Sequence, residues 1–154
     1  MKNRWTGINT KNIHRSNKLL AHEYGEDFVY DEMMLTGPGE QGEAMAKFVA
    51  EDKSMAENPM QPGEGPTKEE RENGFYDVLF VGSNSDGKTL MASVKGDKDP
   101  GYGSTCKMIA ESAVCLLKNP EAASGGIWTP ASALGSLLID RLQANAGLSF
   151  QVEG

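Results

Sequence analysis

The chain has 154 residues, and its 22 acidic and 15 basic side chains give a formal net charge of −7 at pH 7. This excess of negative charge repels a phosphate backbone, and no basic stripe with interleaved aromatic residues occurs, so nucleic acid is not expected as a partner. A domain of this length can bury about two-thirds of its unfolded surface. We therefore expect residues 1–154 to form a single domain.

Membrane insertion and export are not expected either. No apolar run approaches the roughly 18 residues that a membrane-spanning helix needs. The segment Met1–Gly7 carries charge but no following apolar run, unlike a secretory signal. The sequence predicts no membrane partner and a cytoplasmic location.

The first third of the chain is predicted to form a helix, a strand and a second helix. Apolar anchors at helical spacing indicate a helix over residues 11–22, and Gly25 follows as its stop signal. Residues 28–35 have the composition of a strand. Residues 40–56 place Phe48 and its apolar neighbours opposite Glu and Lys side chains, which predicts an amphipathic helix.

Residues 58–74 differ from their surroundings, because they contain three prolines, three glycines and several charges. This composition predicts an exposed loop with a short helical turn at 67–72, and a disordered insertion is the alternative. Two strands follow at 75–81 and 89–94, and the Asp86-Gly87 pair between them indicates an antiparallel hairpin.

The last third is predicted to form two helices and a strand. The first helix opens at residues 101–105, and its apolar face is expected to contain Cys106, Ile109, Ala113 and Leu116. The second helix has Thr129 as its N-cap and Pro130 at its first position. Its apolar stripe is predicted to contain Leu134, Leu137, Leu138 and Leu142. After Gly147, alternating residues predict a final strand.

These elements predict an α+β fold. Half-polar strands and amphipathic helices fit an antiparallel or mixed sheet of about four strands, with helices mainly on one face. From the first strand onward, the order of elements is close to the split βαβ pattern, with a duplicated helix in the second half.

Residues Gly37–Gly42 match the G-x-G-x-x-G pattern of dinucleotide-binding loops. The context argues against that role, because the preceding segment carries two adjacent carboxylates and no second apolar strand ends in an acidic residue about 20 positions later. Glu40 and Glu43 would also repel a phosphate. A glycine-rich connection entering a helix is the favoured interpretation, and a bound dinucleotide is the alternative.

The cysteines and histidines do not indicate a disulfide or a metal site. Cys106 and Cys115 lie about 13 Å apart along one predicted helix, which is too far for a disulfide, so each is expected to be a small buried side chain. His14 and His22 lack a neighbouring third ligand, so zinc is not indicated.

Two sequence segments near the C-terminus and one near the N-terminus resemble a known family. They are Asp99-Pro-Gly-Tyr-Gly103 before a helix, Gly125-Gly-Ile-Trp-Thr-Pro-Ala131 before another, and His14-Arg-Ser-Asn-Lys-Leu-Leu20 followed by Tyr24-Gly25. Their order resembles the C-terminal end of the saccharopine dehydrogenase-like oxidoreductases, a group that also contains trans-acting enoyl reductases. The middle of the chain matches weakly.

This resemblance implies an NAD(P)-dependent oxidoreductase in which a Rossmann domain precedes an α+β domain that lines the substrate pocket and makes subunit contacts. The chain would then be that second, C-terminal domain without the Rossmann domain. We expect no cofactor to bind this chain, although NAD(P) is implied for the full-length family. The whole enzyme would pass a hydride to an imine or an activated alkene.

Five residues are candidates for substrate binding. Tyr102, Ser104 and Thr105 begin a helix whose free amides and partial positive charge suit a carboxylate or another anion, and a purely capping role is the alternative. Arg15 and Asn17 could form a second wall of the pocket, with the guanidinium binding a carboxylate. Alternatively, Arg15 is solvated or paired with Glu23 or Glu26. No catalytic residue is evident.

The partners expected are a small-molecule substrate, if the chain is joined to a Rossmann domain, and a second copy in a homodimer. A stand-alone homo-oligomeric binding or regulatory module without catalysis is the alternative function. A complete small enzyme acting on an acidic metabolite near Tyr102 is a third possibility.

Overall fold

The computed structural model describes residues 6–52 and 63–153. The chain divides into two compact units, an N-terminal unit of Met1–Glu64 and a C-terminal unit of Gly65–Gly154. The prediction of a single domain stays a prediction. No helix in the described ranges is both long and apolar enough to cross a membrane.

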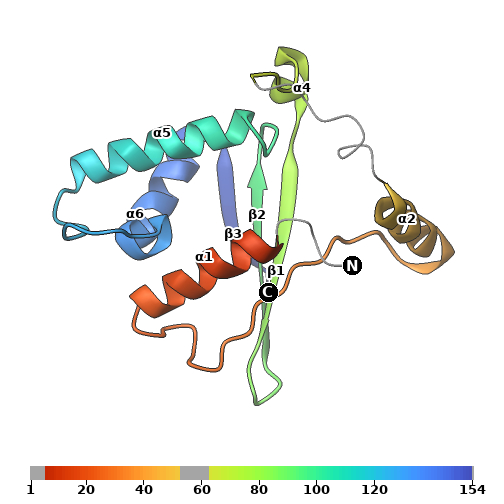
Figure 1. Ribbon diagram of the computed structural model, residues 1–154, viewed down its shortest axis with the longest axis horizontal. Helices are drawn as coiled ribbons and strands as arrows, with labels where there is room; N and C mark the ends of the chain where they lie inside the picture. The colour runs from red at the N-terminus through yellow and green to blue at the C-terminus, as the bar shows by residue number, and fades with distance from the viewer. Residues whose placement is uncertain (1–5, 53–62, 154) are drawn as a thin grey trace. The chain divides into compact units, whose positions relative to one another are not determined.

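Two helices form the regular structure described in the N-terminal unit, α1 (Thr6–Leu19) and α2 (Gly39–Glu51) (Figure 1). Both predicted helices are confirmed, with shifted ends. Helix α1 stops before Ala21 and His22, whose positive φ values of 53° and 66° are incompatible with a continuing right-handed helix. The end of the second predicted helix, from residue 53 onward, lies outside the described residues.

The strand predicted over residues 28–35 is wrong, because only an isolated β-bridge at Met33 occurs there. Val29, Met33 and Leu35 all have exposed side chains. Phe28 and Tyr30 on the alternate side are half-buried, but none of the described strands pairs with this segment along its length, so it does not form a ladder.

The C-terminal unit contains the elements α4 (Lys68–Asn73), β1 (Tyr76–Ser83), β2 (Thr89–Gly96), α5 (Gly103–Lys118), α6 (Pro130–Asn145) and β3 (Leu148–Glu153). The strands form an antiparallel sheet in the order β1-β2-β3. The α+β class and the hairpin are therefore confirmed, and residues 6–52 and 63–153 contain three strands where about four were predicted. The split βαβ order is not formed, because its first strand is absent.

The short helix predicted inside the long loop is confirmed as α4. Thr67 and Glu70 form a reciprocal capping box, in which the Thr67 hydroxyl accepts from the Glu70 amide and the Glu70 carboxylate accepts from the Thr67 amide. The last residues of the predicted loop are thus helical and then enter β1, whereas residues 58–62 lie outside the described part.

The register gives the sheet two chemically different faces. Residues directly opposite in antiparallel strands share a face. One face, named here the apolar face, contains Tyr76, Val78, Phe80, Gly82, Leu90, Ala92, Val94, Gly96, Leu148, Phe150 and Val152. The other face, named the polar face, includes Asp77, Ser93, Lys95, Gln151 and Glu153, together with Leu79, Val81 and Met91.

Helices α5 and α6 pack together and cover one end of the apolar face, with α6 next to β3 (Figure 1). The buried core consists of Cys115, Leu134, Leu138, Leu142, Ala146 and Leu148, with Val94 and Phe150 of the sheet packed against it. The prediction of helices on one face is borne out by these packing partners for α5 and α6. The predicted stripe of α6 is also confirmed, except that Leu137 is exposed.

The face predicted to be buried on α5 is wrong. Cys106, Ile109 and Leu116 are exposed, and the helix instead buries Ser104 and Cys115. Two apolar stripes run along α5, and periodicity cannot tell which one meets α6. The expectation that Cys106 is buried is wrong for the same reason, whereas Cys115 is buried as expected and both thiols are free.

Gly135 breaks the regularity of α6. Its φ of 49° and ψ of −130° lie in a region that residues with a Cβ atom rarely adopt, and the helix is kinked there. Thr129 caps the helix as predicted, by accepting from the Ser132 amide, and Pro130 follows.

We expect Gly135→Ala to lower the free energy of unfolding by about 1–3 kcal/mol, because alanine would be held in this strained conformation. The measurement is urea denaturation followed by circular dichroism. Gly125→Ala is the matched control, since Gly125 has open space around it and no positive φ. That variant should be neutral or more stable by up to about 1 kcal/mol. Equal behaviour of both variants would contradict the strain at Gly135.

Candidate functional site

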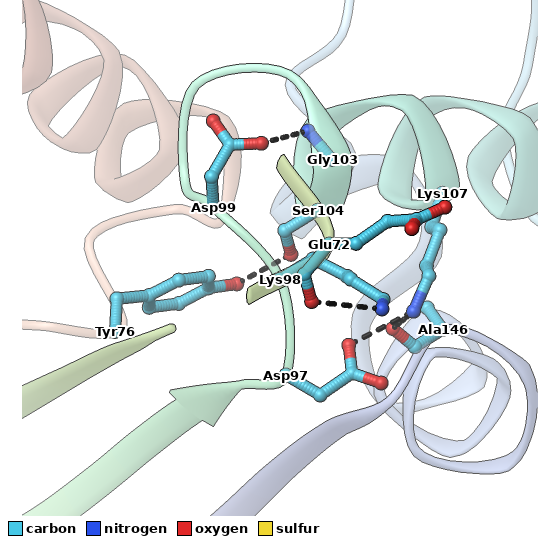
Figure 2. A network of polar contacts seen from close by, with 9 residues as sticks. All are labelled: Glu72, Tyr76, Asp97, Lys98, Asp99, Gly103, Ser104, Lys107 and Ala146. Carbon is cyan, nitrogen blue, oxygen red and sulfur yellow. Dashed lines mark hydrogen bonds and ion pairs between the residues drawn. The ribbon is translucent and has the colours of Figure 1, made fainter. Parts of the chain in front are cut away.

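The loop between β2 and α5 is organised around the carboxylate of Asp99. One carboxylate oxygen accepts from the amides of Gly101 and Tyr102, at 3.0 Å each, and the other accepts from the Gly103 amide. These are the unsatisfied donors that precede and begin a helix. Figure 2 shows the bond from Gly103 across the loop. The protein therefore supplies its own anion to this helix end.

These hydrogen bonds lower the pKa of the Asp99 carboxyl, with the bond from the Tyr102 amide contributing most. The Gly103 and Gly101 amides and the positive charge of Arg71 act in the same direction. Each donor favours the charged form of the carboxyl group. Asp99 is thus held ionised as a structural cap.

Two glycines allow the chain to approach Asp99 closely. A Cβ atom at Gly74 would lie 2.6 Å from the Asp99 Cβ, and one at Gly103 would lie 2.7 Å from the Asp99 carboxylate. The Asp99 amide also donates to the carbonyl of Arg71 at 3.2 Å. Lys98 Nζ donates to the carbonyl of Glu72 at 3.0 Å (Figure 2). The end of α4 is therefore fastened to the loop that begins α5.

A hydroxyl pair links the sheet to the same helix end. The Tyr76 hydroxyl lies 2.9 Å from the Ser104 hydroxyl, and Ser104 is fully buried (Figure 2). The Tyr76 ring lies over Gly96, where a Cβ atom would overlap it. Ser104 is thus a buried contact between β1 and α5.

Lys107 joins three parts of the C-terminal unit. Its Nζ donates to the Asp97 carboxylate at 2.8 Å and to the carbonyl of Ala146 at 3.2 Å (Figure 2). Ala146 is the C-cap of α6, so a cation here satisfies a terminal carbonyl and suits the negative end of the helix. Gly147 has a φ of 69° and packs against the Asp97 carboxylate, as the predicted stop signal requires.

The amides that were expected to bind a ligand are therefore already engaged. The expectation of free amides at residues 101–103 is wrong, because Asp99 accepts from all three. The Thr105 hydroxyl donates to the carbonyl of Pro100 at 2.8 Å. Tyr102 is half-exposed and keeps a surface that a ligand could contact. Substrate binding by Tyr102, Ser104 and Thr105 stays a prediction, with Tyr102 the most accessible of them.

The segment containing Arg15 and Asn17 has a structural explanation within the N-terminal unit. Asn17 is buried, its amide group donates to the Gly25 carbonyl at 2.8 Å, and its oxygen accepts from the Tyr24 amide at 2.9 Å. Phe28 then meets the rings of His14 and Tyr24 edge to face. The resemblance segment and its following Tyr-Gly are thus tied together by one side chain.

Arg15 is exposed on α1. It belongs with Asn17 to the N-terminal unit, whereas Tyr102, Ser104 and Thr105 belong to the C-terminal unit. A pocket shared by the two groups stays a prediction.

The glycine motif at 37–42 leads into α2 without a preceding strand. Gly42 is buried, and a Cβ atom there would overlap the carbonyl of Gly37, so the motif packs against itself. These features support the interpretation of a glycine-rich connection. A dinucleotide-binding loop follows a strand, and none precedes this motif directly in the described residues. The absence of a bound cofactor stays a prediction.

Glu111 of α5 forms an ion pair with a residue of α6. Its carboxylate pairs with the guanidinium of Arg141 between α5 and α6, and only 19% and 22% of the two side chains are exposed. The described residues contain no group of three or more His, Cys, Asp or Glu side chains that could hold a metal ion.

Sequence reasoning missed the exposed part of the apolar face. Val78, Phe80, Leu90 and Val152 come from three strands, share this face and remain exposed beyond the helices. A shallow hollow of about 160 Å³ lies next to them, lined by Ala92, Ser93, Val94, Phe150, Gln151 and Val152. Alternation in β3 and over most of β2 gave a signal for one apolar face, whereas β1 has four consecutive apolar residues at 78–81. Only the register and the helix lengths reveal how much of the face stays uncovered.

Comparison with known proteins finds relatives in mycobacteria. A Mycobacterium tuberculosis H37Rv protein, named as a candidate trans-acting enoyl reductase, is 32% identical over an alignment of 162 positions that covers 93% of this chain and 38% of the relative. Proteins named trans-acting enoyl reductase from Mycobacterium ulcerans Agy99 and Mycobacterium bovis BCG are 28% identical over alignments of 163 positions that cover 90% of this chain and 39% of theirs.

The chain is therefore similar to enoyl reductases and spans less than half of the length of these relatives. No protein-family model matches it. No solved structure matches it significantly.

We expect Asp99→Asn to destabilise the protein near neutral pH, because an amide cannot accept as the carboxylate does from the Gly101, Tyr102 and Gly103 amides. The folded-state pKa lies below the ordinary value of 3.8, so the stabilisation is complete above that value and is lost as the pH falls toward the folded-state pKa. The difference between wild type and variant should therefore shrink in acid.

Thermal denaturation from neutral pH down to below this value measures the effect. Glu121→Gln, at an exposed carboxylate in the loop between α5 and α6, is the control and should leave the stability and its pH dependence nearly unchanged. A constant difference between Asp99→Asn and wild type across the whole pH range would contradict the role of the charge.

Proposed function

We propose that this chain is the substrate-facing and subunit-association part of an enoyl-reductase-like oxidoreductase. In this proposal it corresponds to the C-terminal domain of the saccharopine dehydrogenase-like family. A Rossmann domain outside these residues binds NAD(P). The reaction is transfer of a hydride from the reduced nicotinamide to one carbon of the activated double bond of an enoyl substrate. The other carbon takes a proton from water, and the nicotinamide is left oxidised.

The observation that carries the proposal is the similarity of 93% of the chain to 38% of a protein named as a candidate trans-acting enoyl reductase. The sequence segments containing Asp99 and Thr129 are compatible with the proposal, but each has a structural role at the start of a helix, so they support a fold more than a chemistry.

The apolar face supports a substrate-facing role. Ligand sites are mostly apolar surfaces with few polar groups, and this face carries no charged side chain over three strands. The glycine motif at 37–42 does not fit a dinucleotide, which is why the proposal places the nucleotide on a separate domain.

A chimera tests whether this chain contacts the substrate while a separate domain binds the nucleotide. We expect an M. tuberculosis trans-acting enoyl reductase whose matching region is replaced by this chain to oxidise NADPH in the presence of an enoyl thioester. The same reductase with that region deleted should bind NADPH but not reduce the substrate. Isolated wild-type chain should give no binding heat with NADH or NADPH in calorimetry.

Saturable micromolar binding of either nucleotide to the isolated chain would contradict the proposal. So would a chimera that binds NADPH, keeps its circular dichroism spectrum and yet reduces no enoyl thioester.

A second candidate function is a stand-alone homo-oligomeric module without catalysis, and the outward face of α5 favours it. Ile109, Leu116 and Leu117 are exposed on this helix, and Cys106 and Ala113 lie among them on the exposed surface. Contiguous apolar surface of this kind is typical of association sites.

We expect the chain to form a homodimer at micromolar concentration, as measured by light scattering, because association would remove this surface from water. Ile109→Glu combined with Leu117→Glu should shift the mass toward the monomer of 16.6 kDa. The exposed Glu121→Gln variant is the control and should keep the wild-type mass. A monomer for the wild-type chain would exclude the homo-oligomeric function.

A further inference from the structure

We propose that the exposed part of the apolar sheet face binds the hydrocarbon chain of an acyl substrate. The inference rests on the proposed function, because an enoyl substrate is an acyl group that carries such a chain. It adds a subsite to that function, formed by Val78 and Phe80 of β1, Leu90 and Ala92 of β2, and Val152 of β3.

The chemistry of this surface is that of a hydrocarbon site. Each of these five positions is apolar, and the register places them side by side across three strands. The charged groups of the sheet lie on the other face, where Lys95 Nζ pairs with Asp77 at 2.9 Å and Ser93 donates to the Glu153 carboxylate. An anionic or hydrogen-bonding head group would therefore find no partner on the apolar face, whereas a chain of methylene groups would lose only its contact with water.

The packed core bounds the exposed part of the apolar face at one end, because Val94 and Phe150 pack against the buried cluster of α5 and α6. A shallow hollow at this point is lined by consecutive residues of β2 (92–94) and β3 (150–152). One end of the exposed strip is thus closed by packed side chains. The other end runs toward the β1–β2 hairpin, which extends past the two helices (Figure 1).

The size of the exposed strip favours an alkyl chain over a second copy of the protein as its ligand. From residue 78 to residue 82, four residues of strand span about 13 Å, and three strands spaced at about 4.8 Å add a width of roughly 10 Å. A stable protein interface buries about 800 Å² of accessible surface on each partner and involves roughly 20–30 residues a side, whereas five residues form this strip. The strip alone is too small for a dimer and is the right scale for one alkyl chain.

The experiment uses saturated acyl pantetheines, which cannot be reduced and so need neither NADPH nor a Rossmann domain. Butanoyl, octanoyl and dodecanoyl pantetheine are titrated into the chain below their micelle concentrations, with calorimetry as the readout. Because each buried methylene adds favourable transfer free energy, we expect the dissociation constant to fall at least tenfold from the butanoyl to the dodecanoyl compound.

The sheet offers matched variants on its two faces. Phe80 and Leu79 are 44% and 45% exposed, and Leu90 and Val81 are 62% and 63% exposed. The apolar-face pair Phe80→Ser with Leu90→Ser should raise the dissociation constant of dodecanoyl pantetheine at least tenfold. The control pair Leu79→Ser with Val81→Ser, on the opposite face, should change its affinity less than twofold. Circular dichroism of all variants confirms that the fold is retained.

Three results would overturn the subsite. They are affinity independent of chain length, equal weakening by both pairs of variants, and a fall from dimer to monomer caused by the apolar-face pair, which would assign the surface to a second copy. Chain-length-dependent binding by the isolated protein, together with an inactive chimera, would leave the subsite standing and remove the reductase function. An active chimera whose activity does not depend on the acyl chain length would support the reductase function and exclude the subsite.

Discussion

The carboxylate of Asp99 lies in the loop between β2 and α5 and accepts hydrogen bonds from the amides of Gly101, Tyr102 and Gly103. Its backbone holds the end of α4 through Arg71, and its close contacts require glycine at positions 74 and 103. A short polar loop therefore positions β2, α4 and α5 together. The hydroxyl pair of Tyr76 and Ser104, next to this loop, then aligns β1 with α5.

The same interaction decides what this end of α5 cannot do in its present conformation. A helix end with free amides attracts anions, but an internal carboxylate already occupies that position. A substrate carboxylate would have to displace the Asp99 carboxylate from the Gly101, Tyr102 and Gly103 amides. The local geometry thus favours a structural role for the Asp-Pro-Gly-Tyr-Gly segment. The apolar face of the sheet is then the better candidate for a ligand surface.

That face is divided between two environments. The half near Leu148, Phe150 and Val94 is packed against α5 and α6, while the half near Phe80, Leu90 and Val152 is open. A three-stranded sheet with one covered half satisfies the core of the C-terminal unit and leaves an apolar surface for a ligand or a partner. The similarity to enoyl reductases makes a hydrocarbon chain the occupant proposed for it.

The sequence alone determined the features that depend on near neighbours along the chain. Thr129 and Pro130 mark the start of α6, Gly147 marks its end, and Asp86-Gly87 marks the hairpin, because caps and turns are satisfied by residues within a few positions. The α+β class follows from the same local signals.

Only the tertiary structure decided which apolar surfaces are covered. Residues 28–35 have strand composition but form only an isolated bridge, and α5 carries two apolar stripes of which just one meets α6. The tertiary structure also determines that the Ser104 hydroxyl contacts the Tyr76 hydroxyl and that the Asp99 carboxylate accepts from the helix amides. Burial and hydrogen-bond partners of this kind depend on elements far apart in the sequence, so composition and periodicity do not contain them.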